Sequence, residues 1–343
     1  MQTIVYPPIL DDVVNYNFSK KNRIVIKDCV SGIIGYVNFL DKDTVIVNVE
    51  SNNYTKKKGG DVIKLGTWLD INSVCITKLE DSKKCKMERV LKKNISRISH
   101  NMCIFREKDN KCLYGIGGRY DKCNDGKKPR HRHHKGLYLL TTPLTLKNPW
   151  TILENEKPII STDTLSPYKK PASYDSQLSC IYSTILNKYV LAVRCNIRRG
   201  GRYFSILFSD DCKNWSSFNR PLLDPPYNHK LNDQYYSVLL HEYKPKNILL
   251  GICLFFNEVN VNPFYGIKLL VSTDAINWKD KGILFKLPSG KMPRNGFTRP
   301  KVQCGGINSD DKGNITFFFY KYKCRNKLFY FHKTYTFDTI IKL

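Results

Sequence analysis

Short apolar runs recur along the chain and alternate with polar segments rich in Ser, Asp, Asn, Gly and Lys. Three of these runs, residues 136–140, 203–208 and 266–271, are rich in Leu, Ile, Val, Phe and Tyr. Short runs of this composition, bounded by turn residues, are typical of β-strands. Long segments with the 3.6-residue periodicity of an amphipathic helix are hard to find. The pattern therefore predicts an all-β protein.

Each of these runs leads into one polar motif, which indicates an internal repeat. Residues 209–215 and 272–278 both have the pattern S-x-D-x-x-N-W, and Trp215 and Trp278 lie 63 residues apart. A looser copy, residues 142–150, ends at Trp150, 65 residues before Trp215. Ser and Asp side chains accept backbone N–H groups in tight turns, and a Trp can cover such a turn. A single copy indicates only a hairpin turn, but the regular spacing predicts a repeat architecture.

Two further strand-like runs precede each motif, which gives units of about 60 residues with three or four strands each. This is near the size of one propeller blade. We expect four blades at about residues 94–160, 161–225, 226–290 and 291–343. Residues 1–93 also contain strand-like runs, and we expect a fifth blade or a closing module there; a separate small module is the other alternative. The prediction is a single domain, an all-β, five-bladed β-propeller.

The chain is strongly basic. Its 343 residues include 56 Lys and Arg against 30 Asp and Glu, a formal net charge of +26. Such an excess favours anionic partners, whether nucleic acid, acidic glycan or lipid headgroups. The cations are spread along the chain, however, and the abundance of Lys, Asn and Ile is also what an AT-rich genome produces. A solvated, lysine-rich surface is therefore the default, and nucleic acid is a secondary expectation as a partner.

Other features bear on compartment and cofactors. The 12 cysteines are scattered and form no C-x-x-C pair, so we expect reduced core thiols and no structural zinc site. His131, His133 and His134 stand among cations that disfavour a divalent ion, and we expect neither a metal nor another cofactor. We also expect no membrane span and no signal peptide, hence a soluble protein inside a cell or a virion.

The polar residues at the start of each unit's first strand are the candidate functional groups. The innermost strands of propeller blades begin around a central channel, so residues at equivalent starts converge there. These positions hold His100, Asn101, Asp175, Gln177, Asp233 and Arg299. One interpretation is a polar ring that binds a sugar, and the other is that each residue caps its own strand or joins a neighbouring turn.

Several of these segments together resemble a known family. The repeated S-x-D-x-x-N-W motif, the starts Ser99-His100-Asn101 and Tyr174-Asp175-Ser176-Gln177, and the run 189–194 resemble the five-bladed β-propellers of the arabinanase, levansucrase and invertase type of glycoside hydrolase. The resemblance covers about residues 94–337, and the composition would suit a divergent member from a large DNA virus. It implies a sugar in an axial pocket and three acids: a base or nucleophile from the first blade, an orienting Asp from the second and a Glu from the third.

Only part of this acidic trio is present. Asp175 matches the second-blade Asp, but Asn101 stands where the first-blade Asp is expected, and an amide cannot act as a base or nucleophile. In the third blade Asp233 is the carboxylate near the strand start, so Asp175 and Asp233 are the candidate catalytic pair. The candidate substrate-binding residues are His100, Asn101, Gln177, Arg194 and Arg299. The two arginines would suit an acidic sugar, because a guanidinium can bind a carboxylate through two parallel hydrogen bonds.

Three functions stay open at this point. The first is an active glycosidase that uses Asp175 and Asp233. The second is a propeller that has lost the chemistry and kept the pocket, so that it binds a glycan. The third is a basic structural or virion protein that binds acidic glycan or nucleic acid. The leading prediction is a glycan-directed propeller with catalysis undecided, and carbohydrate is its expected partner.

Overall fold

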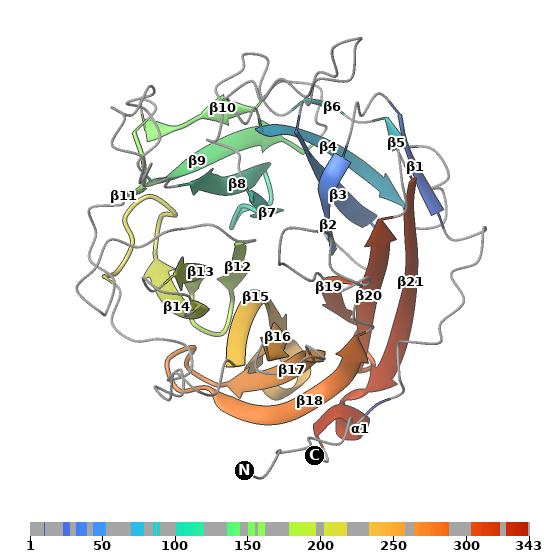
Figure 1. Ribbon diagram of the computed structural model, residues 1–343. Coiled ribbons are helices and arrows are strands. Elements are labelled where there is room, and N and C mark those ends of the chain that lie inside the picture. The colour runs from blue at the N-terminus through green and yellow to red at the C-terminus, as the bar shows by residue number, and fades with distance from the viewer. Residues whose placement is uncertain are drawn as a thin grey trace.

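The protein is an all-β propeller in which five sheets of described strands surround a common centre (Figure 1). The computed structural model describes residues 10, 23–27, 32–39, 44–52, 70–78, 85–86, 88–89, 101–119, 136–144, 150–154, 157–161, 178–196, 202–217, 233–257, 264–287, 303–322 and 327–341. Helix within these ranges comprises α1 (Phe337–Ile341), a 3₁₀ turn (Lys244–Lys246) and 3₁₀ conformation at Glu154. The all-β fold class predicted from the apolar runs is confirmed.

Three of the sheets are meanders of consecutive antiparallel strands. The first runs from β7 (Cys103–Arg106) through β8 (Cys112–Arg119) and β9 (Gly136–Pro143) to β10 (Thr151–Ile152), with β11 (Ile160–Ser161) also paired to β9. The second comprises β12 (Ser179–Ser183), β13 (Lys188–Asn196) and β14 (Arg202–Ser209). The third comprises β15 (Asp233–Tyr243), β16 (Ile248–Asn257), β17 (Phe264–Ser272) and β18 (Lys279–Leu287).

The other two sheets join the two ends of the chain. The C-terminal strands β19 (Gln303–Ser309), β20 (Asn314–Tyr322) and β21 (Lys327–Thr336) are extended by β1 (Arg23–Lys27) and β5 (Cys85–Lys86). β1 pairs antiparallel with β21, with Ile24 opposite Leu328. The remaining sheet contains β2 (Gly32–Phe39), β3 (Thr44–Asn52), β4 (Asp70–Lys78) and β6 (Glu88–Arg89). Backbone hydrogen bonds between the first and last described strands therefore close the ring, whereas the exact division of the chain into units stays a prediction.

Apolar clusters hold neighbouring sheets together. One joins the first two meanders, a second joins the β12–β14 sheet to the β15–β18 sheet, and a third joins the latter to β19–β21. In the third cluster Phe285 of β18 packs edge-on against Phe317 and Phe319 of β20, at centroid distances of 5.2 and 5.1 Å. Full burial of each such side chain contributes about 1.5–3 kcal/mol. The ring is thus stabilised mainly by packing between blades.

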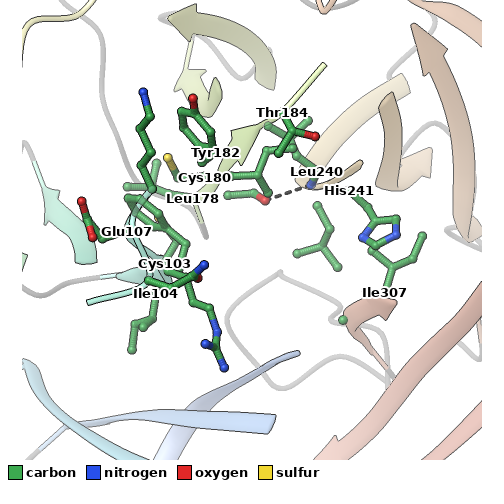
Figure 2. A pocket seen from close by; sticks show the side chains of 18 of the residues that line it. Cys103, Ile104, Glu107, Leu178, Cys180, Tyr182, Thr184, Leu240, His241 and Ile307 are labelled. Carbon is green, nitrogen blue, oxygen red and sulfur yellow. Dashed lines mark hydrogen bonds between the residues drawn. The ribbon is translucent and has the colours of Figure 1, made fainter. Parts of the chain in front are cut away.

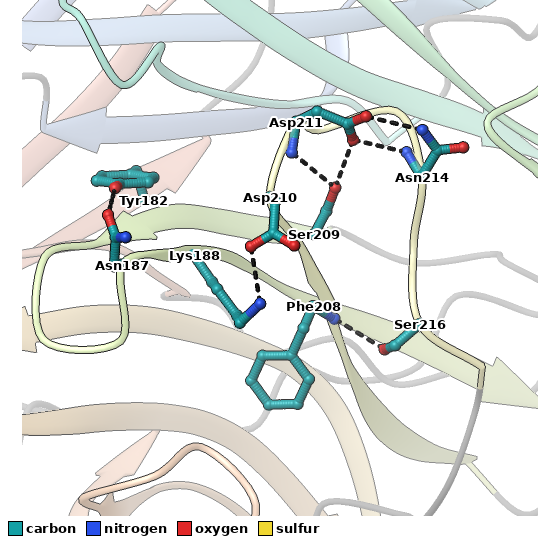
Figure 3. A network of polar contacts seen from close by, with 9 residues as sticks. All are labelled: Tyr182, Asn187, Lys188, Phe208, Ser209, Asp210, Asp211, Asn214 and Ser216. Atoms are coloured by element: carbon teal, nitrogen blue, oxygen red, sulfur yellow. Dashed lines mark hydrogen bonds and ion pairs between the residues drawn. The ribbon is translucent and has the colours of Figure 1, made fainter.

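The S-x-D-x-x-N-W motif forms the same hydrogen-bonded turn after β14 and after β17. In the first copy Asp211 Oδ1 accepts the backbone N–H groups of Lys213 and Asn214 at 2.9 and 2.8 Å, and Asp211 Oδ2 accepts Asn214 Nδ2 at 2.7 Å (Figure 3). Asp274 binds its own turn through Ile276 N, Asn277 N and Asn277 Nδ2 in the same way. The predicted turn is confirmed in both copies.

The tryptophan of the motif closes the turn and packs into its blade. Trp278 Nε1 donates to Ala275 O at 2.9 Å, and Trp215 Nε1 donates to Cys212 O at 3.1 Å. A Cβ on Gly251 of β16 would lie 3.1 Å from the Trp278 ring, so the ring packs directly on that glycine. Trp150 covers Gly115 of β8 in the same manner, at 3.0 Å. The looser third copy therefore places its tryptophan against the equivalent strand of the first meander.

Candidate functional site

The inner strands β7, β12, β15, β19 and β2 lie nearest the centre of the ring (Figure 1). β12 lies between β7 and β15, and β19 lies between β15 and β2. We call the end of the central region at which β7, β12 and β15 begin the start mouth, near Asn101, Leu178 and Tyr236. The end mouth is the opposite end, near Lys108, Thr184 and Lys244. The sequence places its candidate residues at the start mouth.

Asn101 holds the first two inner strands together at the start mouth. It is buried, with 4% of its surface exposed, and has a left-handed backbone with φ of 51°. Its carbonyl oxygen accepts the N–H of Leu178 at 3.5 Å, next to the beginning of β12. Asn tolerates this backbone region better than most residues, but the conformation is uncommon and such residues cluster at functional sites. Asn101 therefore has a position-specific backbone role beside any role in binding a sugar.

Arg194 connects two blades close to the beginning of β15. Its side chain is 4% exposed, its Nη1 donates to Tyr236 O at 3.3 Å, and its guanidinium lies over the Tyr236 ring at 5.0 Å. Both contacts cross from β13 to β15. A buried cation over an aromatic face is favourable, because it combines electrostatic attraction with dispersion. Arg194 thus fixes the start of β15 relative to the neighbouring blade.

Three inner strands bulge near their first residues. The register shifts between Tyr235 and Ser237 in β15, between Cys304 and Gly306 in β19, and between Gly32 and Ile34 in β2. A bulge inserts one residue, bends the strand and turns its side chains, and bulges are frequent beside active sites. The start mouth therefore departs from regular sheet geometry on three strands.

The structure describes only some of the predicted site residues. Asp233 is the first residue of β15 and pairs with Asn257, while its side chain lies outside the described part. The other predicted residues, His100, Asp175, Gln177 and Arg299, lie outside the described residues. Asn101 and Arg194 are both buried near the start mouth. The assignment of the catalytic pair and of the sugar-binding residues stays a prediction.

A pocket of about 320 Å³ lies between the inner strands, and its lining follows β12 from Leu178 to Thr184. Its charged residues lie toward the end mouth, so we call it the end-mouth pocket. Its lining contains apolar side chains of four strands, among them Ile104, Leu240 and Ile307, together with polar groups (Figure 2). The polar and charged side chains that line it are Arg106, Glu107, Lys108, Asn110, Ser179, Thr184, His241 and Lys244, and Tyr182 adds an aromatic ring. Ligand pockets typically enclose about 300–1,000 Å³, and the volume of this pocket is at the lower end of that range.

His241 is an uncharged residue in the lining of this pocket. Its Nε2 lies 2.9 Å from Ser309 Oγ of β19, so it connects two inner strands. Burial lowers the pKa of His241 to about 4, although the nearby Glu242 carboxylate works in the opposite direction. The imidazole is therefore uncharged near neutral pH, so one of its ring nitrogens donates a hydrogen bond and the other accepts one.

Glu242 has a structural role next to the pocket. Its carboxylate accepts the hydroxyls of Ser183 and Thr184, at 2.7 and 2.5 Å, and the N–H of Ile185 at 3.3 Å. It thereby caps the β12–β13 turn from the adjacent blade. Three buried thiols, Cys103, Cys180 and Cys212, belong to one apolar cluster between the first two meanders, and Cys103 and Cys180 also line the pocket. Among the described residues no three His, Cys, Asp or Glu side chains are arranged to hold a metal ion.

The pocket residues were not among the sequence candidates. Lys108, Tyr182, His241 and Lys244 stand at or just beyond the ends of inner strands, whereas the sequence argument considered only strand starts. The signal that could have found them is a polar or aromatic residue immediately before each predicted hairpin turn. That signal is weak, because turns on any exposed edge are polar.

Comparison with known proteins supports the fold. No family model matches the sequence, and no curated protein matches it. The structure is similar to an endo-arabinase from Bacteroides thetaiotaomicron, with a TM-score of 0.55 and 12% identity over 92% of this chain and 98% of that chain. It is also similar to an α-L-arabinofuranosidase from Clostridium thermocellum, with a TM-score of 0.52 and 10% identity over 84% of this chain and 82% of that chain.

A third similar structure has a different chemistry. An N-acetylgalactosamine deacetylase from F. plautii, in complex with blood group B trisaccharide, gives a TM-score of 0.52 and 11% identity over 98% of this chain and 96% of that chain. At these identities the likeness shows the fold, a propeller shared with arabinanase-type glycoside hydrolases. Within the part of the chain that the structure describes, no helix is both long and apolar enough to cross a membrane.

Proposed function

We propose that the protein is a carbohydrate-directed propeller that binds a sugar at the start mouth. The observation that carries the proposal is the extent of the structural likeness. It covers 92% of this chain for the endo-arabinase and 98% for the deacetylase, and each of those proteins is named for an action on carbohydrate. One fold can host unrelated activities, so the residues at the site have to be tested directly.

The described geometry of the start mouth supports this location. Asn101 has a left-handed backbone there, Arg194 bridges two blades, and β15, β19 and β2 bulge at their beginnings. Left-handed residues and bulges are frequent beside functional sites, which supports this location. The comparisons do not favour the alternative prediction of a non-catalytic basic structural or virion protein that binds acidic glycan or nucleic acid.

In the catalytic version of the proposal, Asp175 and Asp233 act on a glycosidic bond. One carboxyl group protonates the leaving oxygen, and the other acts as nucleophile or activates a water molecule. A separation of about 5–5.5 Å would give retention of anomeric configuration, and about 6.5–9.5 Å would give inversion. Asn101 occupies the position where the family resemblance expects a third carboxylate, so turnover has to come from this pair alone.

The test is release of reducing sugar from a panel of neutral and acidic glycans. The wild-type protein is compared with Asp175→Asn, Asp233→Asn and the control Asp210→Asn, whose carboxylate forms an exposed ion pair with Lys188 at 2.7 Å. We expect release by the wild type and the control, and loss by at least ~100-fold in both other variants, because general acid–base groups contribute about 10²–10⁴-fold. The anomer of the first product, followed by NMR, then gives the stereochemistry.

Binding is measured on the same panel, so that a non-catalytic protein is also recognised. Arg299→Ala is expected to weaken retention of the bound glycan whether or not the bond is cleaved. The proposal is overturned if no glycan is released and no glycan is retained by the wild type. It is also overturned if Asp175→Asn, Asp233→Asn and Arg299→Ala all retain glycan as the wild type does.

A further inference from the structure

The end-mouth pocket has an uneven charge. Three cations, Arg106, Lys108 and Lys244, line it together with one carboxylate, Glu107. Neither Lys108 Nζ nor Lys244 Nζ forms an ion pair with a carboxylate among the described residues. The neighbouring Lys111 lies 4.0 Å from Asp109, and Lys188 lies 2.7 Å from Asp210, so nearby lysines do form such pairs. The pocket therefore has ammonium charge that is not neutralised by a neighbouring carboxylate.

The pocket also has the mixture of surfaces that suits a sugar ring. Tyr182 provides an aromatic face, and Lys108 Nζ lies 5.4 Å from the centroid of that ring. The Tyr182 hydroxyl is held by Asn187 Oδ1, which fixes the ring in place (Figure 3). Figure 2 shows Glu107 and His241 on opposite sides of the pocket, with Tyr182 and Thr184 between them. Apolar faces of sugars pack on aromatic rings, while their hydroxyl groups need polar partners of this kind.

The four strands that line the pocket are fixed to one another. Lys108 N donates to Tyr189 Oη at 3.0 Å, and Leu240 N donates to Ser179 Oγ at 2.9 Å. Glu242 and His241 add contacts to the β12–β13 turn and to Ser309. The backbone segments that present Lys108, Tyr182 and His241 are thus positioned by cross-blade hydrogen bonds. A site held in this way loses little conformational freedom when a ligand binds.

From these observations we infer that the end-mouth pocket is a second carbohydrate site, specific for a sugar unit that carries a carboxylate. Lys108 and Lys244 bind the carboxylate, Tyr182 packs on the sugar ring, and Thr184 and the neutral His241 bind hydroxyl groups. Glu107 opposes the ligand's charge and limits its affinity. The inference rests on the proposed function only in taking the ligand to be a carbohydrate, and it concerns the residues of the pocket that lie toward the end mouth.

The decisive comparison uses two ligands that differ in one group. Methyl glucuronide carries a carboxylate where methyl glucoside carries a hydroxymethyl group, and both have the same ring. Ligand-observed NMR titration of the full-length protein at low and moderate salt gives the two dissociation constants. We expect the glucuronide to bind at least ~5-fold more tightly at low salt, with the difference decreasing as salt screens the ammonium groups. Inorganic phosphate serves as a competitor that carries charge without a sugar ring.

Matched variants locate the binding. Lys108→Ala with Lys244→Ala is expected to bring the affinity for the glucuronide down to that for the glucoside. Lys111→Ala with Lys246→Ala removes two cations from the same two segments without touching the pocket lining, and is expected to leave binding unchanged. Glu107→Gln is expected to strengthen glucuronide binding, because it removes the repelling carboxylate. An unfolded or merely destabilised variant cannot produce tighter binding.

Three results would overturn the inference. Equal affinities for glucuronide and glucoside would show that the protein does not recognise the carboxylate. Equal losses of glucuronide affinity in the two double-lysine variants would show that binding occurs outside the pocket. If phosphate competes as well as the glucuronide does, the pocket recognises charge alone and not the sugar ring. Glucuronide binding that depends on Lys108 and Lys244 but survives Asp175→Asn and Asp233→Asn supports this site even if the proposed function at the start mouth fails.

Discussion

Asp211 concentrates several hydrogen bonds in one exposed turn, beside a second aspartate that has a very different setting. Asp211 accepts two backbone N–H groups and the Asn214 side chain, whereas Asp210 pairs only with Lys188 on the surface. Asp211→Asn places an amide N–H₂ against donors, so it should lower the free energy of unfolding by about 1–3 kcal/mol. Asp210→Asn should change it by less than ~0.5 kcal/mol. Urea unfolding of both variants measures the difference, and equal effects would contradict the assigned role of the turn.

The same aspartates predict a dependence of stability on acid. Slight burial works to raise the pKa of Asp211 and Asp274, but hydrogen bonds from Asn214 and Asn277 and their turns outweigh it and lower each pKa to about 2. Because these pKa values lie below the ordinary value of an aspartate, their contribution to stability is present above pH 4 and is lost as the pH falls toward 2.

The measurement is the urea midpoint of wild type and the Asp211→Asn, Asp274→Asn double variant between pH 6 and pH 3. The wild type should lose more stability than the variant over the range from pH 4 to pH 3, because the variant has no carboxylates at these positions to protonate. Repulsion among the many cations acts on both proteins and cancels in the comparison. Parallel curves would show that the two turns do not titrate with unfolding.

At the scale of the elements, the apolar runs and the tryptophan repeat were sufficient to predict strands and turns. Residues 203–208 and 266–271 lie in β14 and β17, and both S-x-D-x-x-N-W segments form the expected turn. The bulge at Tyr235 and Ser237 could not be predicted, because it depends on how strands meet in the folded protein and not on local propensity. The same holds for Glu242, whose partners Ser183 and Thr184 come from another blade and are 59 and 58 residues away in sequence.

Glu242 also gives a prediction about how adjacent blades are joined. Its carboxylate accepts Ser183 Oγ at 2.7 Å across the boundary between β12 and β15. In a double-mutant cycle, Glu242→Ala and Ser183→Ala should each destabilise the protein, and together by less than the sum of the two. We expect a coupling energy of about 0.5–3 kcal/mol, as found for residues that share a hydrogen-bond network.

The control for that cycle pairs Glu242→Ala with Ser216→Ala. Ser216 Oγ accepts Phe208 N at 3.0 Å within its own blade, so its loss should add independently to the loss of Glu242. Chemical unfolding of the four variants and their combinations measures both couplings. A coupling near zero for Ser183, or the same coupling for Ser216, would show that Glu242 does not join the two blades.

For the whole molecule, the closure of the ring depends on backbone pairing between strands from opposite ends of the chain. Arg23, Ile24 and Val25 of β1 pair with Phe329, Leu328 and Lys327 of β21. β1 also pairs with β5, so its removal exposes two strand edges at once. A protein that lacks residues 1–27 should therefore unfold at a lower temperature and aggregate more readily than the full chain.

Adding a synthetic peptide of residues 19–31 should restore part of the lost stability, more so at higher peptide concentration, because binding to the folded state alone stabilises that state. Thermal unfolding followed by circular dichroism measures both effects, and a peptide of the same composition in scrambled order provides the control. An unchanged melting temperature after the deletion, or equal rescue by the scrambled peptide, would show that the pairing of β1 with β21 does not hold the ring closed.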